Sequence, residues 1–292
     1  MATHGERTAL VSFLASAILA GGNAVCIRFT NRELAPLWGA GLRFALAAAL
    51  LLAVVAAMRL DLPRGRALVG SLLYGALQFG GAFALAYYGF VRIPAGLGQT
   101  ILAVVPLATL LLAVLQRQEK LHRSAVVGGI LALAGVGVMY GAPLSGSIPL
   151  LSLLALLGAA FCFGQAAIVV RRFPTVHPVT MNALGMAVGA ALLVGTALVA
   201  GLPVRLPERP ATWAALAYLV VIGSVVVFVL ILVVLRHWAA SRASYGFVVS
   251  PPVTLLLGAW LLDEPVGWGL AIGGILVLAG VYVGALRGPD SG

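Results

Sequence analysis

The chain has 292 residues, of which 62% are hydrophobic and only 9% charged, and its mean hydropathy is +1.11. Soluble globular domains carry roughly 25% charged residues, so this composition excludes a soluble domain and indicates an integral membrane protein. The net charge of +10 suggests a nucleic-acid partner at first sight. However, the basic residues lie almost wholly at the ends of apolar stretches, with no basic aromatic patch, so we expect no nucleic-acid binding.

Apolar stretches follow one another along the whole chain, each near the ~20 residues that cross a hydrocarbon core. They predict an all-α integral membrane protein with ten transmembrane helices, at 9–29, 36–58, 67–91, 94–115, 124–141, 149–170, 178–200, 211–235, 243–262 and 267–286. The connections between them are short and leave no room for a soluble domain.

The first three stretches contain polar and aromatic residues that are candidates for a substrate cavity. Asn23 lies in the first stretch, and Gln78, Phe79 and Phe83 lie in the third. Gln78 and Phe79 are in the middle of their stretch, where an aromatic belt at the membrane interface does not account for them. For the phenylalanines, contact with lipid is an equally good interpretation.

Arg43 is the one charge that lies away from the ends of the predicted spans, about seven residues or ~10 Å from the start of its span at 1.5 Å per residue. A charge at this depth indicates function by default, and no span contains an acidic partner for it. Arg43 would snorkel outward, bond to backbone carbonyls at a broken helix, or meet a substrate carboxylate. We favour bonding to carbonyls.

The fourth and ninth stretches are interrupted by proline, at Pro106 and at Pro251-Pro252. Proline removes a helical hydrogen bond and clashes with the preceding turn, so each helix is expected to kink in its middle. A proline-interrupted pair at corresponding places points to a transport site, and we interpret these prolines as a hinge or gate. A static kink is the alternative. Gln99, in the fourth stretch, is a further cavity candidate.

The fifth and tenth stretches are rich in glycine, leucine and valine and nearly free of polar side chains. The pairs Gly137/Gly141 and Gly280/Gly284 would allow close helix approach. These stretches are predicted to be peripheral scaffold, with contact between two protomers as the alternative.

The second half of the chain supplies the remaining cavity candidates. They are aromatic or uncharged polar residues: Phe161, Phe163, Gln165, Asn182 and Tyr245. A buried amide needs a hydrogen-bond partner, which is either a substrate or a neighbouring helix. For any single amide the two interpretations are equally good, whereas the set as a whole favours a cavity lining.

The chain contains two copies of one unit, 1–143 and 149–287. Residues 104–138 match 249–283 at an offset of 145, which places Pro106 on Pro251. Earlier parts match at an offset of 142, which places Asn23 on Gln165, so both amides are expected to face a central cavity. Each half has five predicted spans, an odd number, so the halves must have inverted topology. Such repeats indicate a transporter with its site between the halves.

The basic residues are distributed unequally between the two ends of the predicted helices. If the N-terminus is cytoplasmic, 12 of the 18 lie inside and 5 outside, with Arg43 in a span. The positive-inside rule therefore predicts that both termini are cytoplasmic. The inside set is Arg7, Arg59, Arg64, Arg66, Arg117, Lys120, Arg123, Arg171, Arg172, Arg236, Arg242 and Arg287, and the outside set is Arg28, Arg32, Arg92, Arg205 and Arg209.

Residues that perform chemistry are absent from the predicted spans. All eight acidic residues lie at span ends or in loops, so the sequence lacks the carboxylate with which proton-coupled exporters usually relay protons. This favours a facilitator, with a proton shuttle by His237 as a minor alternative. There is no phosphate-binding glycine loop, metal-ligand spacing or catalytic set, so we expect no enzyme, no cofactor and no metal.

These motifs resemble the EamA type of the drug/metabolite transporter superfamily. The resemblance rests on Pro36…Arg43-Phe44, on Pro106…Glu119…Gly128-Gly129…Gly135-Val136, and on the second copy Pro251…Glu264…Gly273-Gly274…Gly280-Val281. Within the superfamily the chain is most similar to YddG-type amino-acid exporters of bacterial inner membranes. The resemblance implies a basket of ten helices, with cavity walls from spans one to four and six to nine. It also implies an aromatic residue of span six in the cavity, either Phe161 or Phe163.

The combined expectation is a bacterial inner-membrane exporter of aromatic and other neutral amino acids that works by alternating access. Its partners would be the small-molecule substrate and the lipid bilayer, and a monomer is compatible with the sequence. An exporter of drugs or cationic compounds with the same fold is the alternative, and a non-transporting membrane scaffold is a weaker one.

Overall fold

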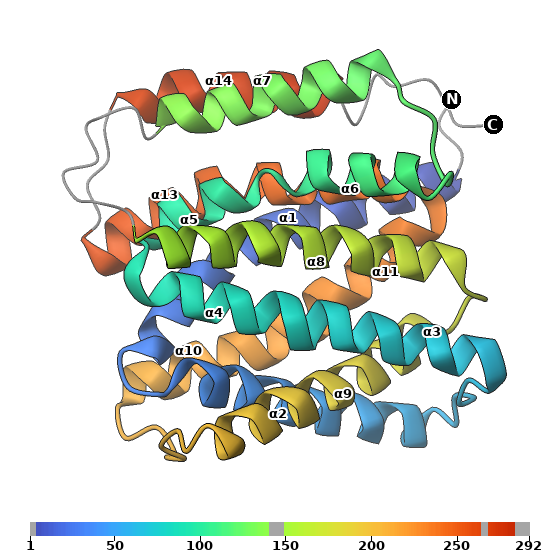
Figure 1. Ribbon diagram of the computed structural model, residues 1–292, viewed down its shortest axis with the longest axis vertical. Helices are drawn as coiled ribbons and strands as arrows, with labels where there is room; N and C mark the ends of the chain where they lie inside the picture. The colour runs from blue at the N-terminus through green and yellow to red at the C-terminus, as the bar shows by residue number, and fades with distance from the viewer. Residues whose placement is uncertain (1–3, 140–148, 264–267, 284–292) are drawn as a thin grey trace.

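The computed structural model describes residues 4–139, 149–263 and 268–283, and this part of the chain is helical, without a strand. Its helices lie side by side with their axes across the long dimension of the molecule (Figure 1). The first half contains α1 (His4–Asn31), α2 (Pro36–Ala57), α3 (Gly65–Gly75), η1 (Ala76–Ala82), α4 (Phe83–Arg92), α5 (Ala95–Leu102), α6 (Val105–Leu115) and α7 (Arg123–Met139). The second half contains α8 (Leu150–Arg172), α9 (Pro178–Val199), α10 (Pro210–Val220), η2 (Val221–Val226), α11 (Val227–His237), α12 (Ala240–Ser244), α13 (Gly246–Leu262) and α14 (Gly269–Val281).

Seven helical stretches within the described residues are long and apolar enough to cross a membrane. They correspond to seven of the ten predicted spans. The other three predictions fall on α5 with α6, on α7 and on α14, whose described helices are shorter. The count of ten spans therefore stays a prediction.

Corresponding helices of the two halves pair at the two ends of the molecule's long axis. α2 packs against α9 at one end, and α7 packs against α14 at the other (Figure 1). Proline occupies the start of both α2 and α9, where its missing N–H breaks no helical bond. Gly280 of α14 packs against Ala132 of α7, whereas Gly141 and Gly284 lie outside the described residues.

The middle of the molecule has reciprocal contacts. α1 packs against α11 and α13, and its counterpart α8 packs against α4 and α6, so each half's first helix contacts helices at the same two places in the repeat. The arginines at the ends of these helices also correspond. Arg28 donates to the Ile93 carbonyl at 2.8 Å, and Arg171 donates to the Trp238 carbonyl at 2.5 Å.

The third and eighth spans each contain a π-helical segment, a feature that hydropathy does not predict. η1 begins at Ala76 and η2 at Val221, so the two segments are related by the repeat offset. A π-helical turn adds one residue to the ring closed by each backbone hydrogen bond and often marks a functional site. Both segments lie beside the cavity described below.

The expectation that Pro106 kinks the middle of a continuous helix is wrong. α5 ends at Leu102, and Pro106 lies in the first turn of α6, where proline costs no backbone hydrogen bond. Pro251 and Pro252 do lie inside a helix, α13, although that span is also interrupted earlier, at Tyr245. The fourth and ninth spans are therefore both broken.

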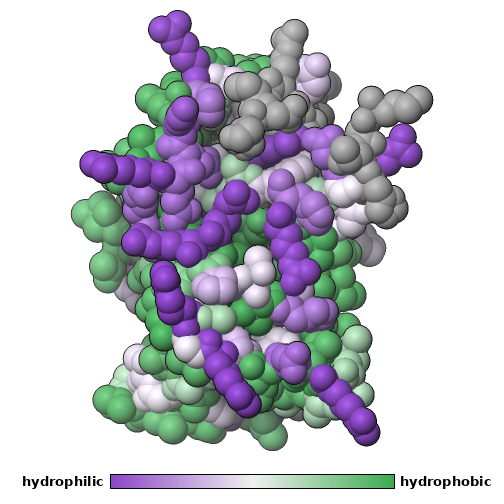
Figure 2. Space-filling model, turned by 90° about the vertical axis from the view of Figure 1, so that its right-hand side faces the viewer, coloured by the Kyte–Doolittle hydropathy of each residue, from purple (hydrophilic) through white to green (hydrophobic). Residues whose placement is uncertain are grey.

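The two ends of the helices differ in charge. The segments after α2, α6, α8 and α11 lie at the right-hand edge of Figure 1, and those after α1, α4 and α9 at the left. Figure 2 shows many hydrophilic side chains on the right-hand end. Most of the described basic residues of the inside set lie in or next to the right-hand segments. Arg287 lies outside the described residues.

Two carboxylates of the first half accept hydrogen bonds from the starts of helices of the second half. One contact lies at each of the two ends of the helices. Glu33, after α1, accepts hydrogen bonds from the Glu208 and Arg209 N–H groups, which precede α10. Glu119, between α6 and α7, accepts from the Ser241 N–H at 3.2 Å and from the Ser241 hydroxyl. Negative charge is favourable at a helix start, so both contacts fasten the halves together.

The Glu33 contact should make stability fall at acid pH. The pKa of Glu33 is lowered, chiefly by the hydrogen bond from the Thr212 side chain and then by the Glu208 N–H. A lowered pKa stabilises the fold above the unfolded value, near 4.5, and this stabilisation is lost as the pH falls through the folded pKa. We expect Glu33→Gln to lower the Tm at pH 7, and the gap from the unaltered protein to shrink below about pH 4.5. A gap independent of pH would contradict this.

Gly75 and Gly185 set the closest approach of two spans. A Cβ on Gly75 would lie 2.5 Å from the Cα of Gly185 and 2.6 Å from its carbonyl oxygen, so Gly75→Ala would force α3 away from α9. We expect this change to cost roughly 1–3 kcal/mol and to lower both Tm and yield. A Cβ added to Gly195 of α9 would have no neighbour within 4 Å, so Gly195→Ala is the control that should leave the Tm unchanged or raise it.

Candidate transport cavity

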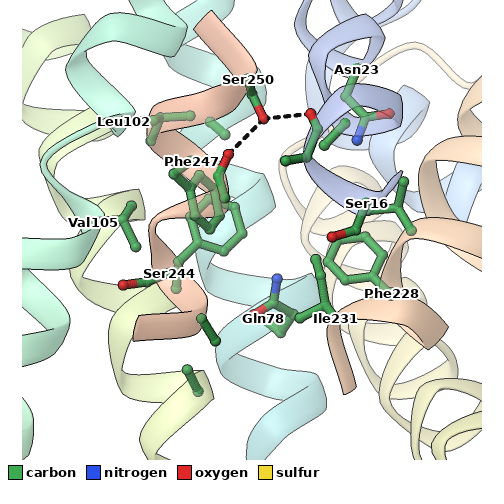
Figure 3. Close-up of a pocket in the computed structure, with 18 of the residues that line it drawn as sticks. Ser16, Asn23, Gln78, Leu102, Val105, Phe228, Ile231, Ser244, Phe247 and Ser250 are labelled. Carbon is green, nitrogen blue, oxygen red and sulfur yellow. Dashed lines mark hydrogen bonds between the residues drawn. The ribbon is translucent and has the colours of Figure 1, made fainter. Parts of the chain in front are cut away.

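A cavity of about 100 Å³ lies between the two halves of the chain (Figure 3). Helices of both halves form its walls, namely α1, α3, η1, α4, α5 and α6 from the first half, and α8, α11, α12 and α13 from the second. The described residues that line it include no charged side chain. A cavity without charged side chains suits a small molecule without net charge.

The polar groups of the lining are amides and hydroxyls. Gln78 projects into the space between the walls, and Asn23 lies above it on α1 (Figure 3). Ser250 donates to the carbonyls of Ala17 and Gly246, both at 2.9 Å, which holds α13 against α1. The other lining residues with amide or hydroxyl side chains are Ser16, Tyr74, Gln99 and Ser244.

Phenylalanine rings form much of the apolar lining. Phe83 meets Phe163 edge to face with 5.3 Å between ring centroids, and it meets Phe228 in the same way at 5.9 Å. Phe163 also contacts Phe247, with centroids 5.0 Å apart. Offset and edge-to-face geometries are the favoured ones for aromatic pairs, so these rings pack against one another in favourable arrangements.

Both broken spans border the cavity. Leu102 and Val105 lie on either side of the break between α5 and α6, and Ser244 and Gly246 on either side of the break between α12 and α13. Interrupted helices present unpaired backbone groups and partial charges at their ends. In transporters, interruptions of this kind occur where substrate binds.

The lining positions of the two halves correspond to one another. Pairs of lining residues are related by the offset of 145, namely Phe83 with Phe228, Ala86 with Ile231, Phe90 with Leu235, Gln99 with Ser244, Leu102 with Phe247, and Val105 with Ser250. The cavity is thus built from the same places in both repeats, although the residue types differ.

The family is shown by a match over nearly the whole chain. The EamA-like transporter family matches residues 7–141 and, a second time, residues 150–285. The chain belongs to this family. The EamA-family assignment agrees with the resemblance stated from the sequence motifs.

Several proteins are similar to this EamA-family chain over most of their length. The uncharacterized inner membrane transporter YedA of Escherichia coli K12 is 29% identical over 91% of this chain and 87% of its own. A probable amino-acid metabolite efflux pump of the same organism is 26% identical over 90% of both. The uncharacterized transporter YyaM of Bacillus subtilis is 25% identical over 96% of this chain and 94% of its own.

A solved crystal structure shares the fold of this EamA-family chain. It aligns with a TM-score of 0.78, covers 96% of this chain and 97% of its own, and is 19% identical in sequence. At this identity the likeness concerns the fold alone.

The structure brings together five of the predicted cavity residues. They are Asn23, Gln78, Phe83, Gln99 and Phe163. Of the two aromatic candidates in span six, Phe163 lies at the wall, while Phe161 is 47% exposed on the outer surface.

The other candidates lie outside the lining and contact neighbouring helices. Phe79 is buried between Phe44, Tyr74 and Phe228, and Asn182 accepts a hydrogen bond from the Tyr74 hydroxyl at 3.1 Å. Gln165 forms a pair with Gln116 at 2.7 Å. Tyr245 donates to the Ala125 carbonyl at 2.8 Å.

Gln165 does not mirror Asn23 because the two helices correspond at a different register. Lining residues of α1 and α8, such as Ala20 with Phe163 and Ala24 with Ala167, are related by 143. The offset of 142 that matches Asn23 with Gln165 is therefore one residue short. One residue turns a helical side chain by 100°, which carries Gln165 away from the cavity.

Arg43 lies behind the cavity wall and is fully buried. Its Nη2 donates to the Gly223 carbonyl at 2.9 Å and its Nε donates to the Ser224 hydroxyl at 2.8 Å, both in η2. The guanidinium carbon is 4.9 Å from the ring centroids of Phe44 and Phe83. Of the three sequence-based alternatives, bonding to carbonyls at an irregular helix is the one observed.

Proposed function

We propose that this EamA-family transporter exports amino acids with aromatic or other neutral side chains across a bacterial inner membrane. The observation that carries the proposal is the uncharged cavity between the halves, lined by phenylalanine rings with amides and hydroxyls among them. A zwitterion has no net charge, and its apolar side chain gains from burial against rings. The name of the Escherichia coli relative, a probable amino-acid metabolite efflux pump, supports the same substrate class.

The proposed mechanism is alternating access between two inverted halves of five spans each. The reciprocal contacts of α1 and α8, the two π-helical segments and the paired lining positions support this symmetry. The basic right-hand end of the molecule is proposed to face the cytoplasm, together with both termini. A relative named as an inner membrane transporter supports the location.

Transport is proposed to run without a carboxylate-based proton relay, as a facilitator. The described acidic residues lie at the ends of helices or between them, and none lines the cavity. His237 is at the end of α11, exposed, with Nδ1 at 2.9 Å from the Val233 carbonyl, and is likewise outside the lining.

Uptake of labelled phenylalanine and other amino acids into proteoliposomes, with and without a proton gradient, tests the proposal. Saturable uptake that ignores the gradient would support an amino-acid facilitator. Uptake that needs the gradient would keep the substrate class and overturn the uncoupled mechanism. If no amino acid is taken up, the substrate assignment is wrong.

Export of drugs or cationic compounds is the second candidate, because aromatic rings also attract cations. The ring wall of the cavity favours this function, and the nearby guanidinium of Arg43 opposes it by repelling positive charge. Expression in a sensitive bacterial strain followed by exposure to cationic dyes separates the two candidates. Protection against dyes without any amino-acid flux would favour the second.

A further inference from the structure

We propose that Arg43 is an electrostatic anchor for the substrate carboxylate, so that the cavity selects molecules that carry a carboxylate over those that carry only an amine. The proposal deepens the amino-acid transport proposed above and rests on it. The cavity lining is uncharged, but the positive charge of Arg43 just behind it would make the cavity favour a negatively charged substrate group.

The charge of Arg43 is not balanced within the described part of the chain. Its hydrogen-bond partners are a backbone carbonyl and a serine hydroxyl, which are neutral, and its Nη1 has no hydrogen-bond partner. The Tyr87 hydroxyl, which also lies beside the guanidinium, is a polar group and not a carboxylate. A fully buried guanidinium without a counter-ion is costly, and an anionic substrate group would offset that cost.

Arg43 is close enough to the cavity for its field to act there. Phe83, whose ring centroid is 4.9 Å from the guanidinium carbon, is itself a lining residue. Asn23, another lining residue, reaches the same Gly223 carbonyl as Arg43, at 3.5 Å. One layer of side chains therefore separates the charge from the substrate space, and such a layer screens charge far less than water does.

Asn23 provides a second sign of an incomplete site at the same place. Its Oδ1 is buried without a hydrogen-bond partner. The Nη1 of Arg43, behind the wall, is an unpaired donor, and the Asn23 oxygen, on a lining residue, is an unpaired acceptor. The ammonium of a zwitterion would meet the Asn23 oxygen directly, whereas its carboxylate would be attracted by the charge of Arg43 across the wall. The carboxylate is thus expected to point toward Arg43 and the ammonium toward Asn23.

Competition against labelled phenylalanine in proteoliposomes tests the proposal with the unaltered protein. Two competitors each lack one charged group of phenylalanine, namely 3-phenylpropionate without the ammonium and 2-phenylethylamine without the carboxylate. We expect phenylpropionate to inhibit at least about tenfold more strongly than phenylethylamine. Equal inhibition, or stronger inhibition by the amine, would overturn the anchor while leaving amino-acid transport intact. Absence of phenylalanine uptake would sink both proposals.

Variants test whether Arg43 attracts the substrate carboxylate or only stabilises the packing of α2 against η2. Arg43→Gln should reduce the ratio between the two competitors toward one and raise the KM for phenylalanine, and Arg43→Lys should keep the preference for the carboxylate. Arg171→Gln is the control, because Arg171, like Arg43, donates to uncharged groups of another helix, in this case the carbonyls of Leu235 and Trp238. It should leave the ratio unchanged. A role in packing alone would lower the Tm of Arg43→Gln without altering the ratio, and that result would contradict the anchor.

Discussion

Replacing Ala20 with phenylalanine is expected to abolish most transport while leaving the protein folded. Ala20 lines the cavity from α1, and a benzyl group there would occupy space within a volume of only about 100 Å³. Its counterpart in the second half, Phe163, already contributes a ring to the lining. A further ring at Ala20 would take up space that the substrate needs, so we expect initial uptake rates to fall at least about tenfold.

The matched control for Ala20→Phe is Ala49→Phe, on an exposed position of α2. Both changes add the same ring to a membrane-spanning helix, but the second adds it on the outer surface. We expect Ala49→Phe to retain near-normal flux and both variants to keep their Tm within a few degrees. Normal uptake by Ala20→Phe would mean that the substrate does not pass through this cavity.

The helical segments can be predicted because hydrophobicity alone determines where a chain can cross a membrane. The sequence predicts α2 at 36–58 and α9 at 178–200, and the structure has these helices at Pro36–Ala57 and Pro178–Val199. In both helices the starting proline is a local signal that does not depend on the rest of the fold. The boundaries are accurate for this reason.

The irregular parts of the spans cannot be predicted in the same way because they depend on contacts between distant helices. Gly75, one residue before η1, meets the backbone of Gly185, and no property of the sequence near Gly75 reports this. The expected kink at Pro106 is wrong for a related reason. A proline is compatible both with a kink inside a helix and with the start of a new one, and only the packing of α6 on α8 decides between them.

Part of the candidate site can be predicted from the sequence. The offset of 145 leads from Phe83 directly to Phe228, but hydropathy alone does not distinguish Phe228 from the other apolar residues of its span, so it is not among the predicted residues. Ser16 and Phe247 have no such signal, since the repeat offsets relate them to Ala159 and Leu102, which are not candidate residues. Gln165 shows the opposite error, in which a one-residue slip in the repeat alignment assigns a side chain to the wrong face of its helix.

Replacing both Pro251 and Pro252 with alanine is expected to stabilise α13 and to slow transport. Without N–H groups, these prolines leave the carbonyls of Phe247 and Val248 without their helical partners, one turn after the break at Tyr245. Alanine would supply both N–H groups, and proline costs about 3 kcal/mol in a helix interior. The weak turn carries Phe247 and Ser250 of the cavity wall, so stiffening it opposes any movement of that wall.

Initial uptake rates and Tm measured on the same preparations test this expectation. We expect flux to fall roughly tenfold while the Tm stays level or rises, a combination that simple misfolding does not produce. Pro36→Ala is the matched control, since Pro36 starts α2 and costs no backbone hydrogen bond there. Normal flux in the double variant would mean that the prolines form a static kink. In that case the movement would have to arise at the breaks beside Leu102 and Tyr245, where Pro106→Ala is the corresponding probe of the first half.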